Sequence, residues 1–139
     1  MLLLDTHYYL WLMEGGEKAS KNKSLTKEIE KLIPKKEILV SAISLWEIAM
    51  LASKGRIQIS EPIENWLEES LQAPGIRLVQ LNPKIVADSV NLPGKFHSDP
   101  SDRLIVATAR VMGARLVTAD KLIQKYGKAG NLKLFSLAK

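Results

Sequence analysis

Short runs of apolar residues alternate with stretches of helical periodicity along the whole chain of 139 residues. Each apolar run is continuous and does not alternate with polar residues, as in strands that are buried on both faces. The pattern predicts five strands, at residues 2–4, 38–40, 76–81, 115–118 and 132–135. It also predicts seven helices, at residues 6–13, 25–32, 44–53, 63–71, 83–90, 101–112 and 120–126. This alternation is typical of α/β proteins, in which helices cover both faces of a mainly parallel sheet.

Glycine and proline residues mark the ends of several predicted helices. Gly15-Gly16, Pro34 and Gly55 each follow a helical stretch, and Gly113 is placed to cap the long helix before the fourth strand. The sequence contains no internal repeat, low-complexity segment or interdomain linker. Residues 1–139 are therefore predicted to form a single three-layer α/β domain.

The amino-acid composition excludes several classes of function. The chain has no cysteine, so disulfide scaffolds, thiolate zinc sites and cysteine nucleophiles are excluded. Two histidines argue against a multi-histidine metal site. No apolar run approaches the roughly 20 residues that a membrane helix needs, and the first residues lack the basic start of a signal peptide. We expect a soluble cytoplasmic protein with no membrane association.

Charge is distributed unevenly between the two halves of the chain. The net charge is +5, but residues 1–70 carry 9 basic and 11 acidic residues, whereas residues 71–139 carry 11 basic and 4 acidic ones. A basic half is typical of proteins that bind polyanions such as nucleic acid, although such charges are also found on ordinary solvated surfaces.

Four acidic residues are predicted to meet at one edge of the sheet. Asp5 ends the first strand, Glu47 follows the second, Asp102 begins the helix before the fourth strand, and Asp120 follows that strand. Ligands of parallel sheets bind at the carboxyl ends of the strands. The four carboxylates are therefore candidates for one site.

Each of these acids also has a local structural interpretation. Asp5 and Asp120 stand where a helix N-cap is expected, and Asp102 is placed to complement a helix dipole. Asp99 is readily explained as a turn residue before Pro100. These alternatives stay open when each residue is taken alone.

Glu47 is the only charge within residues 38–53. The helix around it is apolar on nearly every side, so we expect it to be largely buried, where an unpaired carboxylate is unfavourable. A capping box with Ser44, in which Glu47 reaches back to the first turn, is the structural alternative.

Clustered carboxylates repel one another unless a cation neutralises them. Sites made only of oxygen ligands favour Mg²⁺ or Mn²⁺, which bind phosphates and lower the pKa of bound water. On a basic protein, such a site indicates metal-dependent cleavage of phosphodiesters.

At these residues the sequence resembles the PIN domain family, and within it the VapC-like toxin ribonucleases. The resemblance rests on four segments in order along almost the whole chain: Leu3-Leu4-Asp5-Thr6-His7 with Leu10-Trp11, Ser44-Leu45-Trp46-Glu47-Ile48-Ala49, His97-Ser98-Asp99-Pro100-Ser101-Asp102-Arg103 continuing to Ala109, and Leu116-Val117-Thr118-Ala119-Asp120.

The resemblance implies a Rossmann-like sheet in the order 3-2-1-4-5 and a magnesium-dependent ribonuclease that acts on RNA. The family's acids match Asp5, Glu47, Asp102 and Asp120, with Asp99 as an extra acid of this subfamily. It further implies a supporting hydroxyl at Thr118, a cognate antitoxin protein as partner, and a homodimer.

Basic residues near the acids are further candidates. Arg103 is expected beside the acids, where it binds substrate phosphate or balances charge. Weaker candidates for phosphate contacts are Lys54, Arg56, Lys95 and Arg110, which ordinary solvated surface explains equally well. His7 and His97 are interpreted as structural, and Trp46 as a core residue. The cluster Tyr8-Tyr9-x-Trp11 is a candidate contact for an antitoxin.

Two rival functions stay open at this point. One is a non-catalytic RNA-binding or regulatory module with the same fold, and the other is a metal-dependent phosphatase. Intact acids argue against the first, since a site that only binds phosphates gains nothing from negative charge. His7 argues against a haloacid dehalogenase-type phosphatase, which needs a second aspartate two residues after the first.

Overall fold

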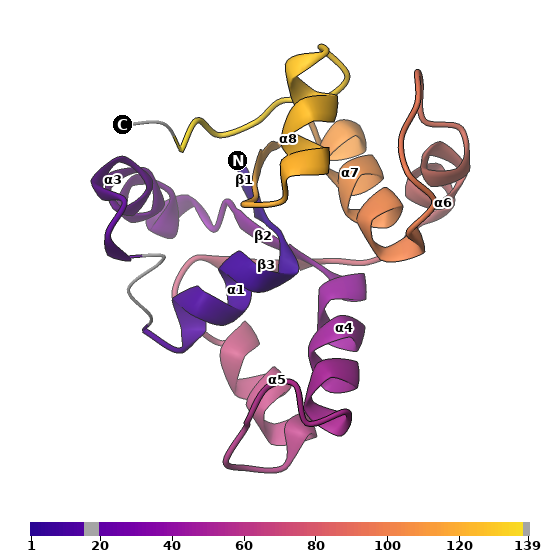
Figure 1. Ribbon diagram of the computed structural model, residues 1–139. Coiled ribbons are helices and arrows are strands. Elements are labelled where there is room, and N and C mark those ends of the chain that lie inside the picture. Colours follow the sequence, from indigo (N-terminus) through magenta and orange to yellow (C-terminus); the bar gives the residue numbers. More distant parts are fainter. Residues whose placement is uncertain (16–19, 138–139) are drawn as a thin grey trace.

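A parallel sheet of four strands lies at the centre of the computed structural model, which describes residues 1–15 and 20–137. The strands are β1 (Leu2–Leu4), β2 (Ile38–Ser41), β3 (Ile76–Val79) and β4 (Arg115–Val117), in the order β3-β2-β1-β4. In the central register, Leu3 pairs with Leu39 on one side and with Leu116 on the other. The predicted α/β class and the order of the first four strands are thus confirmed (Figure 1).

Helices cover both faces of the sheet, as Figure 1 shows. They are α1 (Thr6–Met13), α3 (Lys23–Leu32), the 3-10 helix η1 (Ile33–Lys35), α4 (Ala42–Ser53), α5 (Ile63–Leu71), α6 (Pro83–Val90), α7 (Pro100–Met112) and α8 (Lys121–Lys128). Helix α1 ends before Gly15, which adopts a left-handed φ of 68°. Gly16, the other half of the predicted stop, lies outside the described residues.

Two hydrophobic cores lie on opposite faces of the sheet because successive strand residues point to opposite sides. Leu3 and Leu39 face one core, which they share with buried residues of α6, α7 and α8. Leu2 and Leu4 face the other core, which includes buried residues of α1, α3 and α4. The result is a three-layer architecture. No helix among the described residues is long and apolar enough to cross a lipid bilayer.

The predicted fifth strand is wrong as a strand. Residues 132–135 form only an isolated parallel bridge, in which the backbone N–H of Phe135 donates to the Leu116 carbonyl over 3.0 Å. The side chain of Leu134 instead packs against Gly127 of α8, so closely that a Cβ at Gly127 would lie 2.6 Å from it. Because the segment follows α8 more than the sheet, its pairing ends after one bridge.

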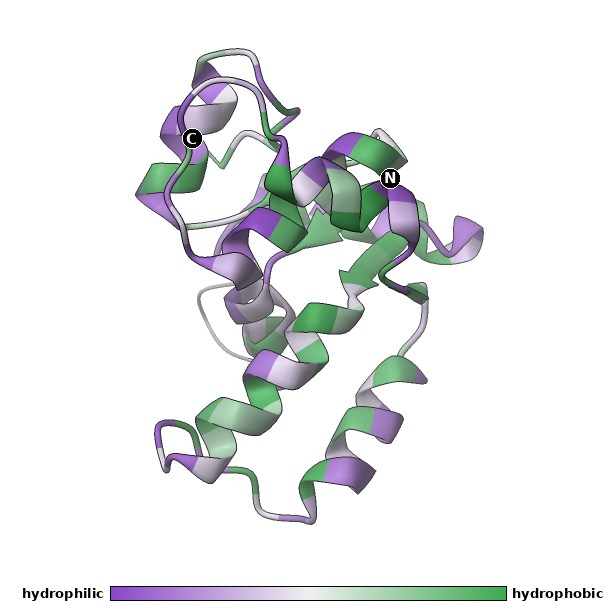
Figure 2. Ribbon diagram, turned by 90° about the vertical axis from the view of Figure 1, so that its right-hand side faces the viewer, coloured by the Kyte–Doolittle hydropathy of each residue, from purple (hydrophilic) through white to green (hydrophobic). Residues whose placement is uncertain are grey.

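For α4, the structure excludes the alternative of a capping box, and the expectation of a largely buried helix with Trp46 in the core is wrong. The N-cap is Ser41, whose side chain accepts from the backbone N–H of Ile43, so Ser44 forms no capping box with Glu47. Only Ser44 and Ile48 are buried in this helix, and the side chain of Trp46 is 56% exposed. The physical reason is that α4 and α5 run side by side away from the sheet (Figures 1 and 2), so no third layer covers the outer side of α4.

Candidate active site

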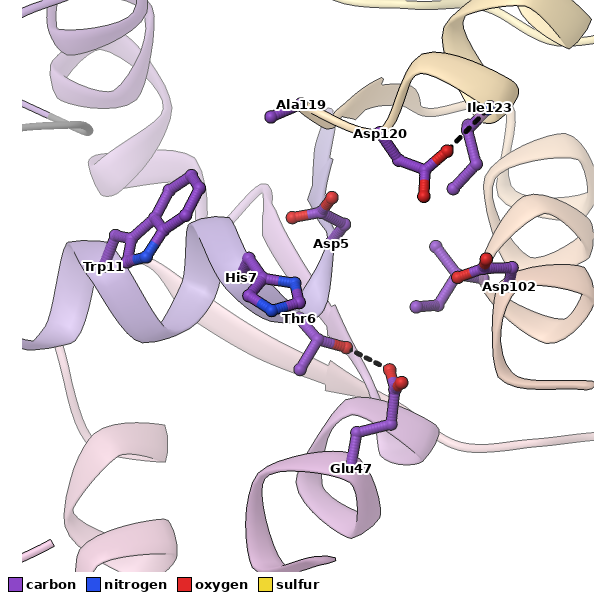
Figure 3. Close-up of a pocket in the computed structure, with 10 residues that line it drawn as sticks. Asp5, Thr6, His7, Trp11, Glu47, Asp102, Ala119, Asp120 and Ile123 are labelled. Atoms are coloured by element: carbon purple, nitrogen blue, oxygen red, sulfur yellow. Dashed lines mark hydrogen bonds between the residues drawn. The ribbon is translucent and has the colours of Figure 1, made fainter. Parts of the chain in front are cut away.

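The four acids singled out in the sequence line one pocket at the carboxyl ends of β1 and β4. We call it the acidic pocket and define it by Asp5, Glu47, Asp102 and Asp120. Its volume is about 380 Å³, and Figure 3 shows the four carboxylates around a shared open space. Among the described residues that line it, none is a lysine or arginine. Residues separated by more than a hundred positions are thus brought together by the sheet.

Asp5 serves both as a helix cap and as part of the pocket wall. It is 7% exposed, and its Oδ1 accepts a hydrogen bond of 2.8 Å from the backbone N–H of Tyr8. The Thr118 hydroxyl donates to its Oδ2 over 2.6 Å. Asp5 can therefore cap α1 and take part in the acidic pocket at the same time. Each of its carboxylate oxygens accepts one hydrogen bond and retains a lone pair for another donor or a cation.

Asp120 caps α8 and is tied to Asp5 through Thr118. Its Oδ1 accepts from the backbone N–H groups of Leu122 and Ile123, at 2.8 and 3.0 Å. Its own backbone N–H donates to the Thr118 hydroxyl over 3.0 Å. Thr118, which is 2% exposed, thus links the end of β4 to both acids, as a supporting residue would.

Glu47 is held by α1 and not by its own helix. The Thr6 hydroxyl donates to its Oε1 and also lies 2.9 Å from the Ser44 hydroxyl. Thr6 lines the pocket and is 3% exposed. Thr6 was not among the site residues predicted from the sequence; its position directly after Asp5, in the first turn of a predicted helix, is the signal that indicates such a role.

Asp102 projects into the pocket from the first turn of α7. Its Oδ2 lies 3.1 Å from Nε2 of His97. That contact is not well aligned, and in the described part of the chain His97 Nε2 has no hydrogen-bond partner. Asp99 is the N-cap of α7 and accepts from the Asp102 backbone N–H over 3.0 Å. Asp99 therefore lies beside the acidic pocket without lining it.

Burial and mutual repulsion raise the pKa of three of these acids. Burial dominates for Asp5, whose pKa is raised although hydrogen bonds from Thr118 and Tyr8 oppose the change. Burial also raises the pKa of Glu47. Burial, followed by the charges of Asp99 and Asp120, raises the pKa of Asp102 to about 6. The pocket thus holds negative charge in an environment that disfavours it, which a cation would relieve.

The donor chemistry of the pocket fits a hydrated divalent cation. All four acids offer oxygen, the ligand type that Mg²⁺ and Mn²⁺ prefer, and Mg²⁺ usually keeps several of its waters. Within residues 1–15 and 20–137, no three acidic or histidine side chains lie close enough to hold one ion as direct ligands. The observed arrangement therefore fits an ion held partly through water.

Two predicted arginines have structural roles away from the pocket wall. Arg103 donates to the backbone carbonyls of Ser89, Phe96 and His97, at 2.7, 3.2 and 3.2 Å. Arg110 pairs with Asp88 at 2.9 Å and donates to the Asn131 carbonyl. Their guanidinium groups are engaged by α6 and by loops, and not by the four acids.

The predicted lysines and Arg56 are also outside the acidic pocket. Lys54 and Arg56 are exposed at the C-terminal end of α4, about two turns beyond Glu47. Lys95 is exposed on the loop before α7 and lines a neighbouring pocket. His7 and Trp11, by contrast, line the acidic pocket, with ring centroids 5.8 Å apart.

An open parallel sheet with four acids at its carboxyl edge defines the class of protein, an α/β domain with an acidic site. The chain belongs to the PIN domain family, whose profile matches residues 2–129.

Among characterised relatives, the chain is 38% identical over 125 residues to ribonuclease VapC22 of Mycobacterium tuberculosis strain H37Rv, covering 90% of this chain and 91% of that protein. Solved structures share the fold. One is VapBC2 from Rickettsia felis bound to a DNA fragment from its promoter, at 21% identity and a TM-score of 0.68, covering 96% of each chain. Another is a toxin–antitoxin complex from Klebsiella pneumoniae, at 19% identity and a TM-score of 0.67, covering 100% of this chain and 99% of that one.

Proposed function

We propose that this protein is a Mg²⁺-dependent ribonuclease that hydrolyses phosphodiester bonds of RNA, with Mn²⁺ as a possible substitute ion. The observation that carries the proposal is the convergence of Asp5, Glu47, Asp102 and Asp120 on one pocket from four separate elements. The 38% identity to a ribonuclease supports RNA as the substrate.

In this proposal, Asp5, Glu47 and Asp102 would hold the metal partly through water, and Asp120 would complete the site. When bound there, the ion would supply positive charge that stabilises the phosphate oxyanion and would lower the pKa of an attacking water. Thr118 and Thr6 orient the carboxylates of Asp5 and Glu47 by donating hydrogen bonds to them. Asp99 adds negative charge beside Asp102, and Arg103 holds the adjoining loop in place.

We further propose that the protein is the toxin of a toxin–antitoxin pair, acts in the cytoplasm and forms a homodimer. Its structural matches to toxin–antitoxin complexes support an antitoxin partner. Size-exclusion chromatography with light scattering measures the oligomeric state, and a monomer at high concentration would contradict the dimer.

The test of the activity compares two substrates under two conditions. The purified protein is incubated with a structured RNA or with p-nitrophenyl phosphate, in Mg²⁺ or in EDTA. We expect cleavage of RNA in Mg²⁺ only. Binding of RNA without cleavage would instead indicate a regulatory module, and release of p-nitrophenol would indicate a phosphatase.

A further inference from the structure

We infer that a second pocket, next to the acidic pocket, binds a nucleotide of the RNA strand that flanks the cleaved bond. We call it the cationic pocket and define it by Lys95, Phe96, His97, Leu122, Lys125 and Tyr126. Its volume is about 340 Å³, within the usual range for small-ligand sites. The inference rests on the proposed function, because it assigns part of the substrate path of the same site.

The charge of the cationic pocket is opposite to that of its neighbour. Lys95 and Lys125 are exposed on its two walls, one on the loop before α7 and the other on α8. No aspartate or glutamate is found among the described residues that line it. Lysines without an acidic partner in the same wall are what a phosphate group requires.

The rest of the lining offers apolar and aromatic surface. Phe96 packs between His97 and Tyr126, with ring centroids 4.3 and 4.9 Å away. Leu122 lines the same pocket from α8, one turn before Tyr126, and is 56% exposed, so its side chain is open to a ligand. Tyr126 is buried, so a base in this pocket would meet Leu122 and the partly exposed rings of Phe96 and His97, next to lysines that hold the backbone.

The two pockets are adjacent through shared structure. His97 lines the cationic pocket while its Nε2 lies 3.1 Å from Oδ2 of Asp102 in the acidic pocket. On α8, Leu122 lines one pocket and Ile123 the other. A strand with its scissile phosphate at the four acids therefore places a neighbouring nucleotide at Lys95 and Lys125.

The walls of the cationic pocket are fixed before any ligand binds. Arg103 donates to the carbonyls of Phe96 and His97, and the Tyr126 hydroxyl donates to the Pro93 carbonyl. The side-chain amide of Asn131 donates to the Tyr126 carbonyl over 3.3 Å. These bonds hold the loop and α8 in place relative to one another. Little conformational entropy is therefore lost when a ligand binds.

The test measures the salt dependence of RNA binding. The probe is a fluorescein-labelled single-stranded RNA of mixed sequence, bound to protein carrying Asp5→Asn so that cleavage does not interfere. Adding Lys95→Gln and Lys125→Gln should weaken binding about 10-fold and reduce the slope of log Kd against log salt by about 1.4, or roughly 0.7 for each lost phosphate contact.

Lys27→Gln provides the matched control, since Lys27 is also exposed in mid-helix but lies on α3, on the opposite face of the sheet. It should leave the slope unchanged. If the slope of log Kd against log salt is the same for the double variant and for this control, the inference is wrong. The lysines of the cationic pocket would then be interpreted as a contact for an acidic protein segment.

The base contact is tested separately by sequencing the RNA ends that the active protein and its Leu122→Ala variant produce. We expect the variant to lose sequence preference at a single position beside the cleaved bond. An unchanged preference would overturn the base contact.

The two proposals fail in distinguishable ways. Absence of RNA cleavage by the wild type contradicts the ribonuclease, whereas the binding assay needs no cleavage and still decides the cationic pocket. In an active protein, the lysine variants should raise KM about 10-fold and change kcat less than about twofold. A change in kcat alone would contradict a binding role.

Discussion

The acidic pocket and the cationic pocket share a wall but differ in how their charges are held. The acids are partly or fully buried, and three of them, Asp5, Glu47 and Asp120, are fixed by hydrogen bonds from Thr118, Thr6 and the start of α8. The lysines are exposed and stand on α8 and a loop. A metal site needs carboxylates in fixed positions, and these repel one another when no cation is bound. A contact to the RNA backbone instead needs exposed charges that a mobile strand can reach.

The largest expected effect comes from removing one buried acid. Asp5→Asn keeps the size and the cap of α1 but removes a charge from the metal site, so the rate of RNA cleavage should fall by at least about 10³-fold. Gel assays in Mg²⁺ measure the rate, and thermal unfolding checks the fold. Glu68→Gln, at an exposed acid of α5, is the control and should cleave normally. Full activity of Asp5→Asn would remove the acidic pocket from the mechanism.

A smaller effect is expected when the acids stay but their support is removed. Thr118→Val deletes the donor to Asp5 and the acceptor of the Asp120 N–H, so activity should fall about 10- to 100-fold. The free energy of unfolding should also fall by about 1–3 kcal/mol, because a buried hydrogen bond to a carboxylate is lost. Thr118→Ser retains the hydroxyl and should restore most of the activity. If valine and serine behave alike, the hydroxyl has no supporting role.

Burial of Asp102, together with repulsion from the neighbouring acids, predicts a gain in stability when this residue is neutralised. Its pKa is about 6 in the folded state against an ordinary 3.8, so the folded state binds this proton more tightly than the unfolded state does. The stabilisation is present below pH 3.8 and is lost as the pH rises through about 6. In EDTA at pH 7.5, Asp102→Asn should therefore raise the free energy of unfolding by about 1 kcal/mol, after allowance for solvent screening.

Urea unfolding at pH 7.5 and at pH 4 measures the difference in free energy of unfolding between Asp102→Asn and the wild type. This difference should nearly vanish at pH 4. Mg²⁺ should narrow it as well, since the ion stabilises the wild type through its acids. If Asp102→Asn is instead less stable than the wild type at pH 7.5, the surroundings of Asp102 favour its ionised carboxylate, and the prediction is wrong.

The smallest effect is expected outside both pockets. Trp46→Ala removes a side chain that is 56% exposed, so the free energy of unfolding should change by about 0.5 kcal/mol or less. Replacing a tryptophan in the core by alanine would instead lower the free energy of unfolding by about 3–5 kcal/mol. Urea unfolding separates the two, and a large loss would restore the sequence-based interpretation of Trp46 as a core residue.

The fold was largely predictable because strand patterns and helix stops are local signals. The order of four strands and the meeting of four acids follow from parallel topology and from the family resemblance. What failed depended on tertiary context. The apolar helix α4 extends beyond the sheet, and Leu134 packs against Gly127, which shortens the fifth strand to one bridge. A local sequence pattern does not indicate which elements cover a helix, or at which residue a segment stops pairing with its neighbouring strand.

The same limit applies to the site. Arg103 and Arg110 lie close to Asp102 in sequence, but their partners are carbonyls of α6 and of two loops, and the carboxylate of Asp88 on α6. The cationic pocket combines a loop and a helix that are separated by the whole of α7 and β4, so its lysines look like ordinary surface in the sequence.

The three hydrogen bonds of Arg103 have a consequence for the products that this protein would make. Two of them, to the carbonyls of Phe96 and His97, fasten the loop carrying Lys95 to α7, the helix that also carries Asp102, and the third fastens α7 to α6 at Ser89. Lys95 and Asp102, which would contact the same bound strand, therefore belong to one rigid piece. Displacing that piece would alter how fast a strand is cut. It would not alter how many nucleotides separate the cut from the nucleotide held at Lys95, and fragments from a slow variant should therefore begin and end at the same nucleotides as those from the wild type.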